Sequence, residues 1–392
     1  MQFIEPRRSG LMSESRKIGA LDGLRGYMAL WVFVTHVTTM ATLQIEKHDT
    51  LGMFFANGEF AVGVFIVLSG FVITLNLQKE HNAGDFYIRR ALRLFPVYWV
   101  CLVASVLTLN LSIEVLHEIP WSEPRLMDRI LYLQNSKEYL VPHLFAHFFL
   151  LHGLIPERML PSTSYAFMGQ AWSLTLEWQY YLVAPLLFWG LTRIKSSYVA
   201  KALALFALIL VSHKFVQSSF LLTYLWLFAV GGMIAEAYQP TTGKNPSRLN
   251  LWVTIAFIVA MVATLQGSMV ISVALFGLSL WAITSPSGSL AHNLSHRVLA
   301  NRIALWLGKI SYGFYCSHMV AIFLSAWLLI EVIGVRERFY FIPELIVSSL
   351  VLALVFSMLL SHYFEIPAIE YGRQLVRKRK LERAELPVTT TP

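Results

Sequence analysis

The sequence predicts an all-α membrane protein, a polytopic bundle of about ten transmembrane helices with both termini in the cytoplasm. Three observations predict this class. Of the 392 residues 56% are hydrophobic and only 14% are charged, whereas a soluble domain averages about 25% charged residues. The apolar residues form long continuous runs, and the lysines and arginines are concentrated in every second gap between these runs. A soluble globular protein could not bury so much apolar surface, so we expect lipid to surround this protein.

Each predicted span is an apolar run close to the roughly 20 residues that a helix needs to cross a bilayer. The runs are continuous rather than alternating, which argues against a transmembrane β-barrel. The ten predicted spans are 27–45, 60–77, 94–112, 174–192, 199–215, 219–237, 250–267, 268–284, 310–332 and 341–363.

The basic residues predict the orientation of these spans. With the N-terminus inside, the inside segments hold 23 of the 31 lysines and arginines. That asymmetry follows the positive-inside rule and places both termini in the cytoplasm. The net charge of +8 therefore reflects topology. We expect no nucleic-acid partner, because no soluble basic face is visible.

The chain divides into a membrane domain between two predicted cytoplasmic tails, which gives 1–18, 19–367 and 368–392. The largest segment between spans, 113–173, is too short and too rich in proline for a separate catalytic domain. Its stretch PHLFAHFFLLHGLIP is apolar but short, which suggests a helix on the membrane surface. We therefore expect the membrane bundle itself to carry the chemistry.

The first candidate site lies in the first span, within LDGLRGYMALWVFVTHV. Arg25 and His36 are eleven residues apart, so they share nearly one helix face and lie roughly 16 Å apart along the axis. Ionisable groups inside spans are costly and are functional candidates. His36 is thus a candidate base, and the alternative is a packing histidine bonded to a neighbouring helix.

The second candidate site is FYIRRALRLFPVYW, which opens the third span with three arginines. Arg93 follows Arg89 by four residues and Arg90 by three, so all three are neighbours on a helix. Guanidinium groups suit phosphate oxygens, and the cluster therefore predicts a phosphate-binding site. The alternative is ordinary anchoring by positive residues on the inner side.

The third candidate site is QAWSLTLEWQYYLVAPLL, where Glu177 falls inside an apolar run after Trp172 and Ser173. Ser173 and Glu177 are four residues apart and share a helix face. A carboxylate there needs a partner such as an arginine, a histidine or a substrate hydroxyl. The alternative is a buried pair with a structural role.

The fourth candidate site is GKISYGFYCSHMV in the ninth span. Ser311, Tyr315 and His318 follow at intervals of four and three residues and form a polar stripe on the helix. Hydroxyl and imidazole groups in a line suggest a cavity lined for water or sugar. The alternative is hydrogen bonding between helices, a frequent use of such residues in membranes.

We expect no metal site. His143 and His147 are one helical turn apart, but no glutamate stands beside them as in the H-E-x-x-H zinc motif. Cys101 and Cys316 both fall inside spans, where a disulfide or metal site is not expected. The sequence also lacks the G-x-S-x-G and G-x-x-x-x-G-K-[ST] motifs, which excludes a nucleophile-elbow hydrolase and a pump of the phosphate-loop type.

From about Leu21 to Pro367 the chain resembles the acyltransferase-3 family of integral-membrane O-acyltransferases. Seven motifs carry the resemblance in the family order, and each would be weak alone: LDGLRG with the Arg25–His36 spacing, GVFIVLSGF, FYIRRALRLFP, WSLTLEWQYY, FAVGGMIA, GKISYGFYCSH and YFEIPAIE. Some members carry an SGNH-type domain after the core. None follows the core in this sequence, so we expect the acyl group to pass directly to the final acceptor.

The resemblance implies a role for each candidate residue. His36 would be the catalytic histidine and Arg25 its paired arginine, and Arg90 with Arg93 would match the pair thought to engage acyl-CoA. Glu177 would be a further functional carboxylate. The other candidates are Arg89, beside the donor pair, and Trp172, Ser173, Tyr315 and His318, which would line the acceptor side.

The implied enzyme moves an acyl group, with acetyl favoured, from cytoplasmic acyl-CoA to a hydroxyl of a cell-envelope or exported glycan such as lipopolysaccharide. It would lie in the bacterial inner (plasma) membrane among lipids, with no permanently bound cofactor. Direct transfer is favoured over an acyl-enzyme, since no serine or cysteine stands out as a nucleophile. The alternatives are O-acylation of a secondary metabolite such as a macrolide sugar, a glycan or small-molecule transporter, and a non-catalytic assembly partner. The oligomeric state stays open.

Overall fold

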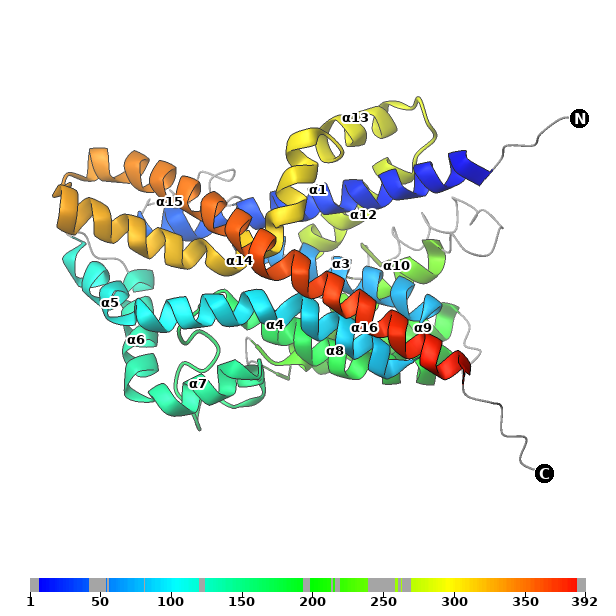
Figure 1. The fold of residues 1–392 in the computed structure, drawn as a ribbon, viewed down its shortest axis with the longest axis horizontal. Helices are drawn as coiled ribbons and strands as arrows, with labels where there is room; N and C mark the ends of the chain where they lie inside the picture. Colours follow the sequence, from blue (N-terminus) through cyan, green and yellow to red (C-terminus); the bar gives the residue numbers. More distant parts are fainter. Residues whose placement is uncertain are drawn as a thin grey trace, which may run out of the picture.

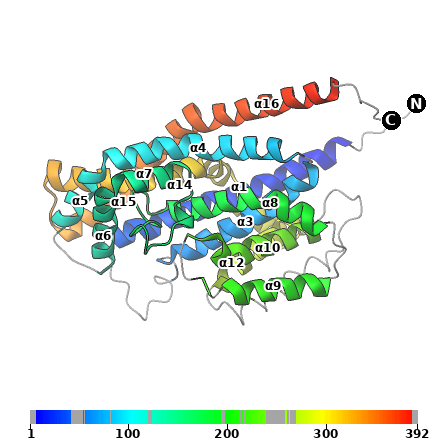
Figure 2. The same cartoon turned by 90° about the horizontal axis from the view of Figure 1, so that it is seen from below.

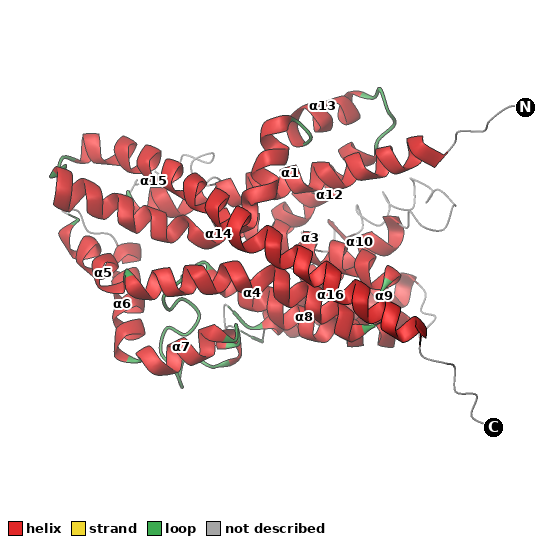
Figure 3. Cartoon of the chain, in the orientation of Figure 1, coloured by secondary structure: helices red, strands yellow, loops and turns green. Residues whose placement is uncertain are grey.

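All regular secondary structure of the described residues is helical in this computed structural model, as predicted (Figure 3). The structure describes residues 7–41, 54, 56–80, 82–119, 124–192, 198–212, 214–215, 219–238, 258–259, 262 and 269–385. The helices are α1 (Arg7–Met40), α3 (Gly58–Lys79), α4 (Ala83–Leu107), α5 (Leu109–Glu118), α6 (Pro124–Glu138), α7 (Leu140–Phe148), η1 (His152–Leu154), α8 (Ala171–Thr192), α9 (Tyr198–Ser212), α10 (Leu221–Tyr238), α12 (Val270–Thr284), α13 (Leu290–Leu299), α14 (Arg302–Trp327), η4 (Leu328–Ile333), α15 (Arg338–Leu360), η5 (Ser361–Glu365) and α16 (Ile366–Glu385).

The centre of the bundle is formed by α1, which packs against both α14 and α3. Helices α10 and α12 cover α3, and α15 packs along α14. Helix α16 continues from α15 through the π-helical turn η5 and lies along the outside of α4 (Figures 1 and 2). Helices α1, α3 and α14, which come from distant parts of the chain, thus surround a common interior.

Glycine residues allow the backbones of α1 and α14 to approach closely. A Cβ atom added at Gly308 would lie 2.3 Å from the carbonyl oxygen of Asp22, and one added at Gly26 would lie 2.7 Å from the Gly308 nitrogen. Small residues at such crossings let membrane helices pack backbone to backbone. This contact brings Arg25 beside the α14 residues that face the interior.

Five helical segments in the described residues are long and apolar enough to cross a membrane. They are Gly58–Lys79, Ala83–Leu107, Leu221–Tyr238, Arg302–Ile333 and Arg338–Glu385. They correspond to the predicted spans that begin at residues 60, 94, 219, 310 and 341. The predicted span 94–112 is longer than the observed helix, because α4 ends at Leu107 and α5 begins after Thr108, the residue that caps α4.

The other predicted spans have weaker support. Shorter apolar helices, Leu203–Ser212 and Val270–Thr284, lie in two of them. Helices α1 and α8, with 34 and 22 residues, are long enough to cross a bilayer. Both carry ionisable side chains, which are Arg25 and His36 on α1 and Glu177 on α8. The predicted span 250–267 lies outside the described residues, except for 258, 259 and 262. The number of ten spans therefore stays a prediction.

The segment after α5 folds into α6, α7 and η1 and packs on the bundle. Helix α7 has nine residues, about 14 Å, which is too short to span a bilayer. Its end is held by α4, because the Tyr98 hydroxyl donates to the carbonyl of His147 at 3.0 Å and the Trp99 indole donates to that of Phe148 at 2.9 Å. Val141 and Phe145 stay exposed, which suits a helix on the membrane surface.

The two ends of the described chain lie at the same end of the molecule. The first turn of α1 and the last turn of α16 lie at this end, and α5 and α6 lie at the opposite end (Figure 1). Helix also continues through residues 7–18 and through 368–385, which we predicted as parts of tails. If both termini lie on one side of the membrane, the two ends of the chain must lie at the same end of the molecule, as they do here. That this side is the cytoplasm stays a prediction.

Candidate active site

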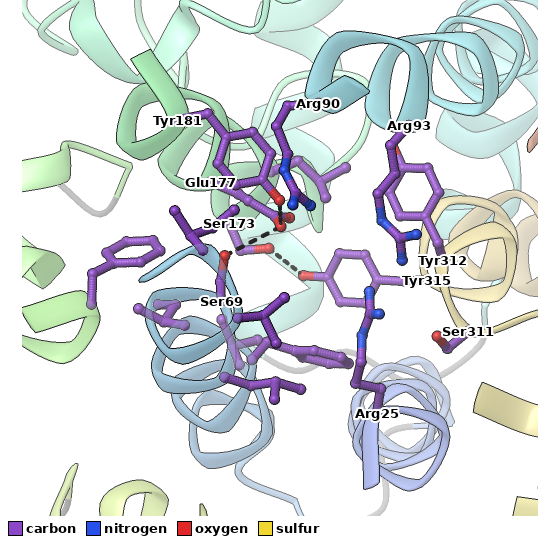
Figure 4. Close-up of a pocket in the computed structure, with 18 of the residues that line it drawn as sticks. Arg25, Ser69, Arg90, Arg93, Ser173, Glu177, Tyr181, Ser311, Tyr312 and Tyr315 are labelled. Atoms are coloured by element: carbon purple, nitrogen blue, oxygen red, sulfur yellow. Dashed lines mark hydrogen bonds between the residues drawn. The ribbon is translucent and has the colours of Figure 1, made fainter. Parts of the chain in front are cut away.

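A cavity of about 210 Å³ lies in the interior between α1, α3, α4, α8 and α14 (Figure 4). Its wall on α3 and α10 is mainly apolar, with residues such as Phe65, Ile66 and Phe228, while the other helices contribute polar groups. The structure brings together seven of the residues predicted from the sequence: Arg25, Arg90, Arg93, Ser173, Glu177, Ser311 and Tyr315.

Three guanidinium groups point into this cavity. Arg90 and Arg93 reach in from α4 and Arg25 from α1 (Figure 4). Arg25 lies 3.7 Å from the carboxylate of Asp22. The Nε atom of Arg90 is buried and has no hydrogen-bond partner among the described residues. Unsatisfied guanidinium donors in a cavity are suited to an anion with several oxygen atoms, such as a phosphate.

Hydroxyl and carboxylate groups line the cavity beside Arg90, whose Cζ atom lies 5.6 Å from the centre of the Tyr181 ring (Figure 4). The Tyr181 hydroxyl donates a hydrogen bond to Glu177 Oε1, and Ser69 donates to the same oxygen at 3.4 Å. Ser173 and Tyr315 are joined through their hydroxyl oxygens at 2.7 Å. Glu177 thus lies with the arginine cavity and is held by hydroxyl groups.

His36 lies outside the cavity, in a second cluster with Arg129 and His318. The ring centroids of His36 and His318 are 5.2 Å apart. His318 in turn lies beside Tyr315, with 5.8 Å between ring centroids, so an aromatic series leads from the cavity to His36. Arg25 therefore lines the cavity, whereas His36 lies with Arg129 and His318, and the predicted pairing of His36 with Arg25 stays a prediction.

The contact with Arg129 determines the proton position on His36. An Nη2 atom of Arg129 lies 2.9 Å from Nδ1 of His36. Because guanidinium nitrogens only donate, Nδ1 must accept, and a neutral His36 then carries its proton on Nε2. His36 can therefore accept a substrate proton at Nδ1 only after the contact with Arg129 opens.

His318 has the opposite arrangement. Its Nδ1 donates to the carbonyl oxygen of Tyr315 at 2.8 Å, so a neutral ring keeps Nε2 unprotonated. This Nε2 atom is buried and has no hydrogen-bond partner in the described part of the chain. The second cluster therefore offers two imidazole groups in complementary tautomers.

Two further predicted site residues, Arg89 and Trp172, lie neither in the cavity nor in the cluster of His36. Arg89 points away from Arg90 and Arg93 and forms an ion pair with Glu80. Trp172 packs on Tyr224, with ring centroids 5.5 Å apart. Their predicted roles in donor binding and acceptor lining stay predictions.

The sequence analysis missed several polar residues in or beside these clusters, among them Tyr181, Ser69, Arg129 and Glu365. Tyr181 follows Glu177 by four residues, and that spacing could have revealed it. Ser69 carries no such signal. Arg129 lies in α6, a helix of mixed polarity where an arginine is unremarkable. Glu365 lies in the π-helical turn η5, buried within electrostatic reach of Arg93 and Arg25, and π-turns are frequent at functional sites.

The histidines of α7 and η1 are buried core residues. His147 and His152 stack with ring centroids 3.9 Å apart. Burial lowers the pKa of His147 to about 3 and holds the pKa of His152 well below its ordinary value, so both rings are neutral near pH 7. Within the described ranges, no group of three or more His, Cys, Asp or Glu side chains could hold a metal ion.

Comparison with known proteins places the chain among acyltransferases. A family model described as "Acyltransferase domain" matches residues 18–362. "Acyltransferase MdmB" of Streptomyces mycarofaciens is 28% identical over 172 residues, which are 43% of this chain and 39% of that protein. "Putative peptidoglycan O-acetyltransferase YrhL" of Bacillus subtilis (strain 168) is 24% identical over an alignment of 409 residues, and this alignment covers 93% of this chain and 57% of that protein.

The chain therefore spans less than two thirds of the length of either relative. No solved structure matches it. The family model nevertheless covers most of the chain, from a point within α1 to a point within η5, and its range includes the residues of the arginine cavity and the cluster of His36, Arg129 and His318. The apolar spans and this match agree that the protein is a membrane protein, and the chain belongs to the acyltransferase-3 family.

Proposed function

We propose that this protein is a membrane O-acyltransferase that moves an acyl group, with acetyl favoured, from cytoplasmic acyl-CoA to a hydroxyl of a cell-envelope glycan. The convergence of Arg25, Arg90 and Arg93 on one interior cavity carries the proposal. A transporter or a purely structural protein has no need of such a cluster beside a series of hydroxyl and imidazole groups. The family match supports the reaction class.

The arginine cavity would hold the donor. CoA carries several phosphate groups, and three guanidinium groups can bind them through charge-assisted hydrogen bonds. The long pantetheine arm would run from this cavity past Tyr315 towards His36. Arg25 and His36 are eleven residues apart on α1, roughly 16 Å along the helix axis, so an extended arm is needed to bridge them.

The imidazole cluster would carry out the transfer. The acceptor hydroxyl takes the place of Arg129 at Nδ1 of His36 and gives its proton to that nitrogen. Its oxygen forms a bond to the thioester carbon, the carbon–sulfur bond breaks, and the CoA thiolate leaves and takes the proton from His36. The displaced Arg129 is then free to face the oxyanion that forms at the carbonyl oxygen.

The acceptor is proposed from the relatives. The name of the Bacillus subtilis relative refers to peptidoglycan, a cell-envelope glycan, and this supports the same acceptor class in the bacterial plasma membrane. A secondary-metabolite sugar is the alternative acceptor. Both classes offer a secondary hydroxyl to the same base.

The test is transfer of labelled acetyl groups from acetyl-CoA by the purified full chain in lipid vesicles. Peptidoglycan fragments, other envelope glycans and a macrolide are offered as separate acceptors. The wild type is compared with His36→Ala, His318→Ala and the control His117→Ala, which removes an exposed histidine on α5. We expect label on a glycan with the wild type and the control, and none with His36→Ala.

Other outcomes assign other functions. Label only on the macrolide would assign the alternative acceptor. Loss of transfer with His318→Ala but not with His36→Ala would make His318 the base. No binding of acetyl-CoA to the wild type would contradict the proposal and favour a transporter.

A further inference from the structure

The basic helix α16 contributes to a second pocket that lies apart from the arginine cavity. A groove of about 340 Å³ between α4 and α16 is lined by Arg89, Arg373, Val376, Arg377, Lys380 and Leu381. Four of these six residues are cations. Those of α16 lie beyond residue 362, where the family model ends, so the match to the family does not account for them.

The cations of α16 fall into separate groups by their contacts. Asp85 is fully buried and binds Arg379 at 3.5 Å and also Arg383, which attaches α16 to α4. Lys378 lies 3.9 Å from Glu382 on the exposed side. The three that line the groove are Arg373, Arg377 and Lys380. Their spacing of four and three residues places them on one helix face.

The groove has an excess of positive charge. Glu80 pairs with Arg89 and lies 3.5 Å from Lys380, and Glu370 lies 3.5 Å from Arg373. Arg377 forms no ion pair with any residue that the structure describes. Four cations thus face two carboxylates, and this excess of positive charge on a largely exposed face attracts an anion.

We propose that the groove between α4 and α16 is a binding site for a phosphate group. Guanidinium and ammonium groups from two helices can surround such a group, as phosphate sites require. Arg89 and Arg90 are adjacent on α4, with Arg89 facing the groove and Arg90 facing the interior cavity. A ligand held in the groove would therefore lie next to the proposed donor site.

Two sources carry this chemistry at a membrane surface. One is the 3′-phosphate of CoA, with the remaining phosphates at Arg90 and Arg93, and this source rests on the proposed function. The other is the headgroup of an anionic phospholipid, which basic residues beside a membrane attract. The lipid source does not depend on acyl-CoA being the donor.

The first arm of the test titrates the full chain, in a detergent without anionic lipid, with CoA and with 3′-dephospho-CoA. For a 3′-phosphate site we expect CoA to bind about tenfold more tightly than dephospho-CoA. The double variant Arg377→Gln/Lys380→Gln should lose this difference, and the control Lys378→Gln should keep it. All three proteins are first compared by melting temperature to confirm that they fold equally.

The second arm measures phospholipid retained by the same proteins after reconstitution in phosphatidylglycerol or in phosphatidylcholine. For a lipid site we expect the wild type and Lys378→Gln to retain phosphatidylglycerol and the double variant to lose it. No effect of the double variant in either arm would overturn the phosphate site. If no protein binds CoA, the proposed donor fails, and the lipid arm alone decides.

Discussion

His36 and Arg129 are 93 residues apart in the sequence, yet they meet side chain to side chain. If Arg129 holds the tautomer of His36 and then faces the oxyanion, its removal should lower kcat and leave the KM for acyl-CoA nearly unchanged. We expect Arg129→Gln to lose about a hundredfold in kcat, as for one oxyanion donor, and Arg129→Lys to recover part of it. Steady-state kinetics in both substrates measure this. A variant with normal kcat would remove Arg129 from the mechanism.

Arg90 and Arg93 belong to the other cluster and should act on binding. Loss of one charge-assisted contact to a phosphate weakens binding about tenfold. We therefore expect Arg90→Gln and Arg93→Gln each to raise the KM for acyl-CoA by that factor and to leave the KM for the acceptor unchanged. Arg302→Gln, at an exposed position in the first turn of α14, is the matched control. Equal effects on both substrates would make the two arginines structural.

The sequence alone could reveal those site residues that violate the rules of a membrane span. Arg90, Glu177 and His36 are ionisable groups in or beside apolar runs, and their cost there makes them visible. Arg129 could not be found this way, because a cation in a polar helix outside the spans carries no penalty. The division of the candidates between two clusters was equally hidden, since it depends on how α6 and α14 pack against α1 and how α8 packs against α3 and α4.

At the scale of the helices, the crossing of α1 and α14 fixes both clusters. A Cβ atom at Gly308 would lie 2.3 Å from a backbone oxygen of α1, and neither backbone can move without shifting its helix. We expect Gly308→Ala to destabilise the fold by about 1–3 kcal/mol, the usual range for overpacking. The control Gly190→Ala meets no atom within 4 Å on α8. Melting temperatures in detergent measure the difference. If they fall equally for Gly308→Ala and Gly190→Ala, the close contact between α1 and α14 is not the cause.

The attachment of α16 to α4 should depend on pH through Glu80. Burial raises the pKa of Glu80, but its bond to Arg89 and the charges of Arg89 and Lys380 outweigh this and hold the pKa below its ordinary value of 4.5. The ionised carboxylate therefore adds stability above that value, and the stability is lost as the pH falls through the lowered pKa of the folded state.

We expect Glu80→Gln to melt below the wild type at neutral pH and to approach it in strong acid. Thermal melts of both proteins across this range measure the difference. Glu382→Gln removes an exposed carboxylate of α16 and should follow the wild type at every pH. A difference between wild type and Glu80→Gln that persists in acid would show that ionisation of Glu80 is not its cause.

Helix positions were more predictable than helix ends. Hydrophobic runs located α3, α10 and α14, because an apolar segment of sufficient length has few other places to go. The apolar run through 94–112 gave no sign of the break between α4 and α5 at Thr108, because neither glycine nor proline marks it. We predicted most of α16 as part of a tail, because its sequence is basic and polar. Its attachment to α4 depends on ion pairs with the buried Asp85, and the sequence does not reveal these long-range contacts.

At the scale of the whole molecule, the start of α1 and the end of α16 lie at one end, and α5 and α6 lie at the other (Figure 1). The positive-inside rule predicts that the start of α1 and the end of α16 face the cytoplasm and that α5 and α6 face the outside. The natural chain suits a labelling test, because its two cysteines, Cys101 and Cys316, are both buried. A single new cysteine would then be the main reactive thiol.

We expect Ser9→Cys and Glu385→Cys to react with a membrane-impermeant maleimide only in inside-out vesicles. Lys137→Cys, at an exposed position in the last turn of α6, should react only in right-side-out vesicles. The wild type, measured in both, is the control for the buried cysteines. Reaction of Glu385→Cys and Lys137→Cys from the same side would refute the proposed orientation.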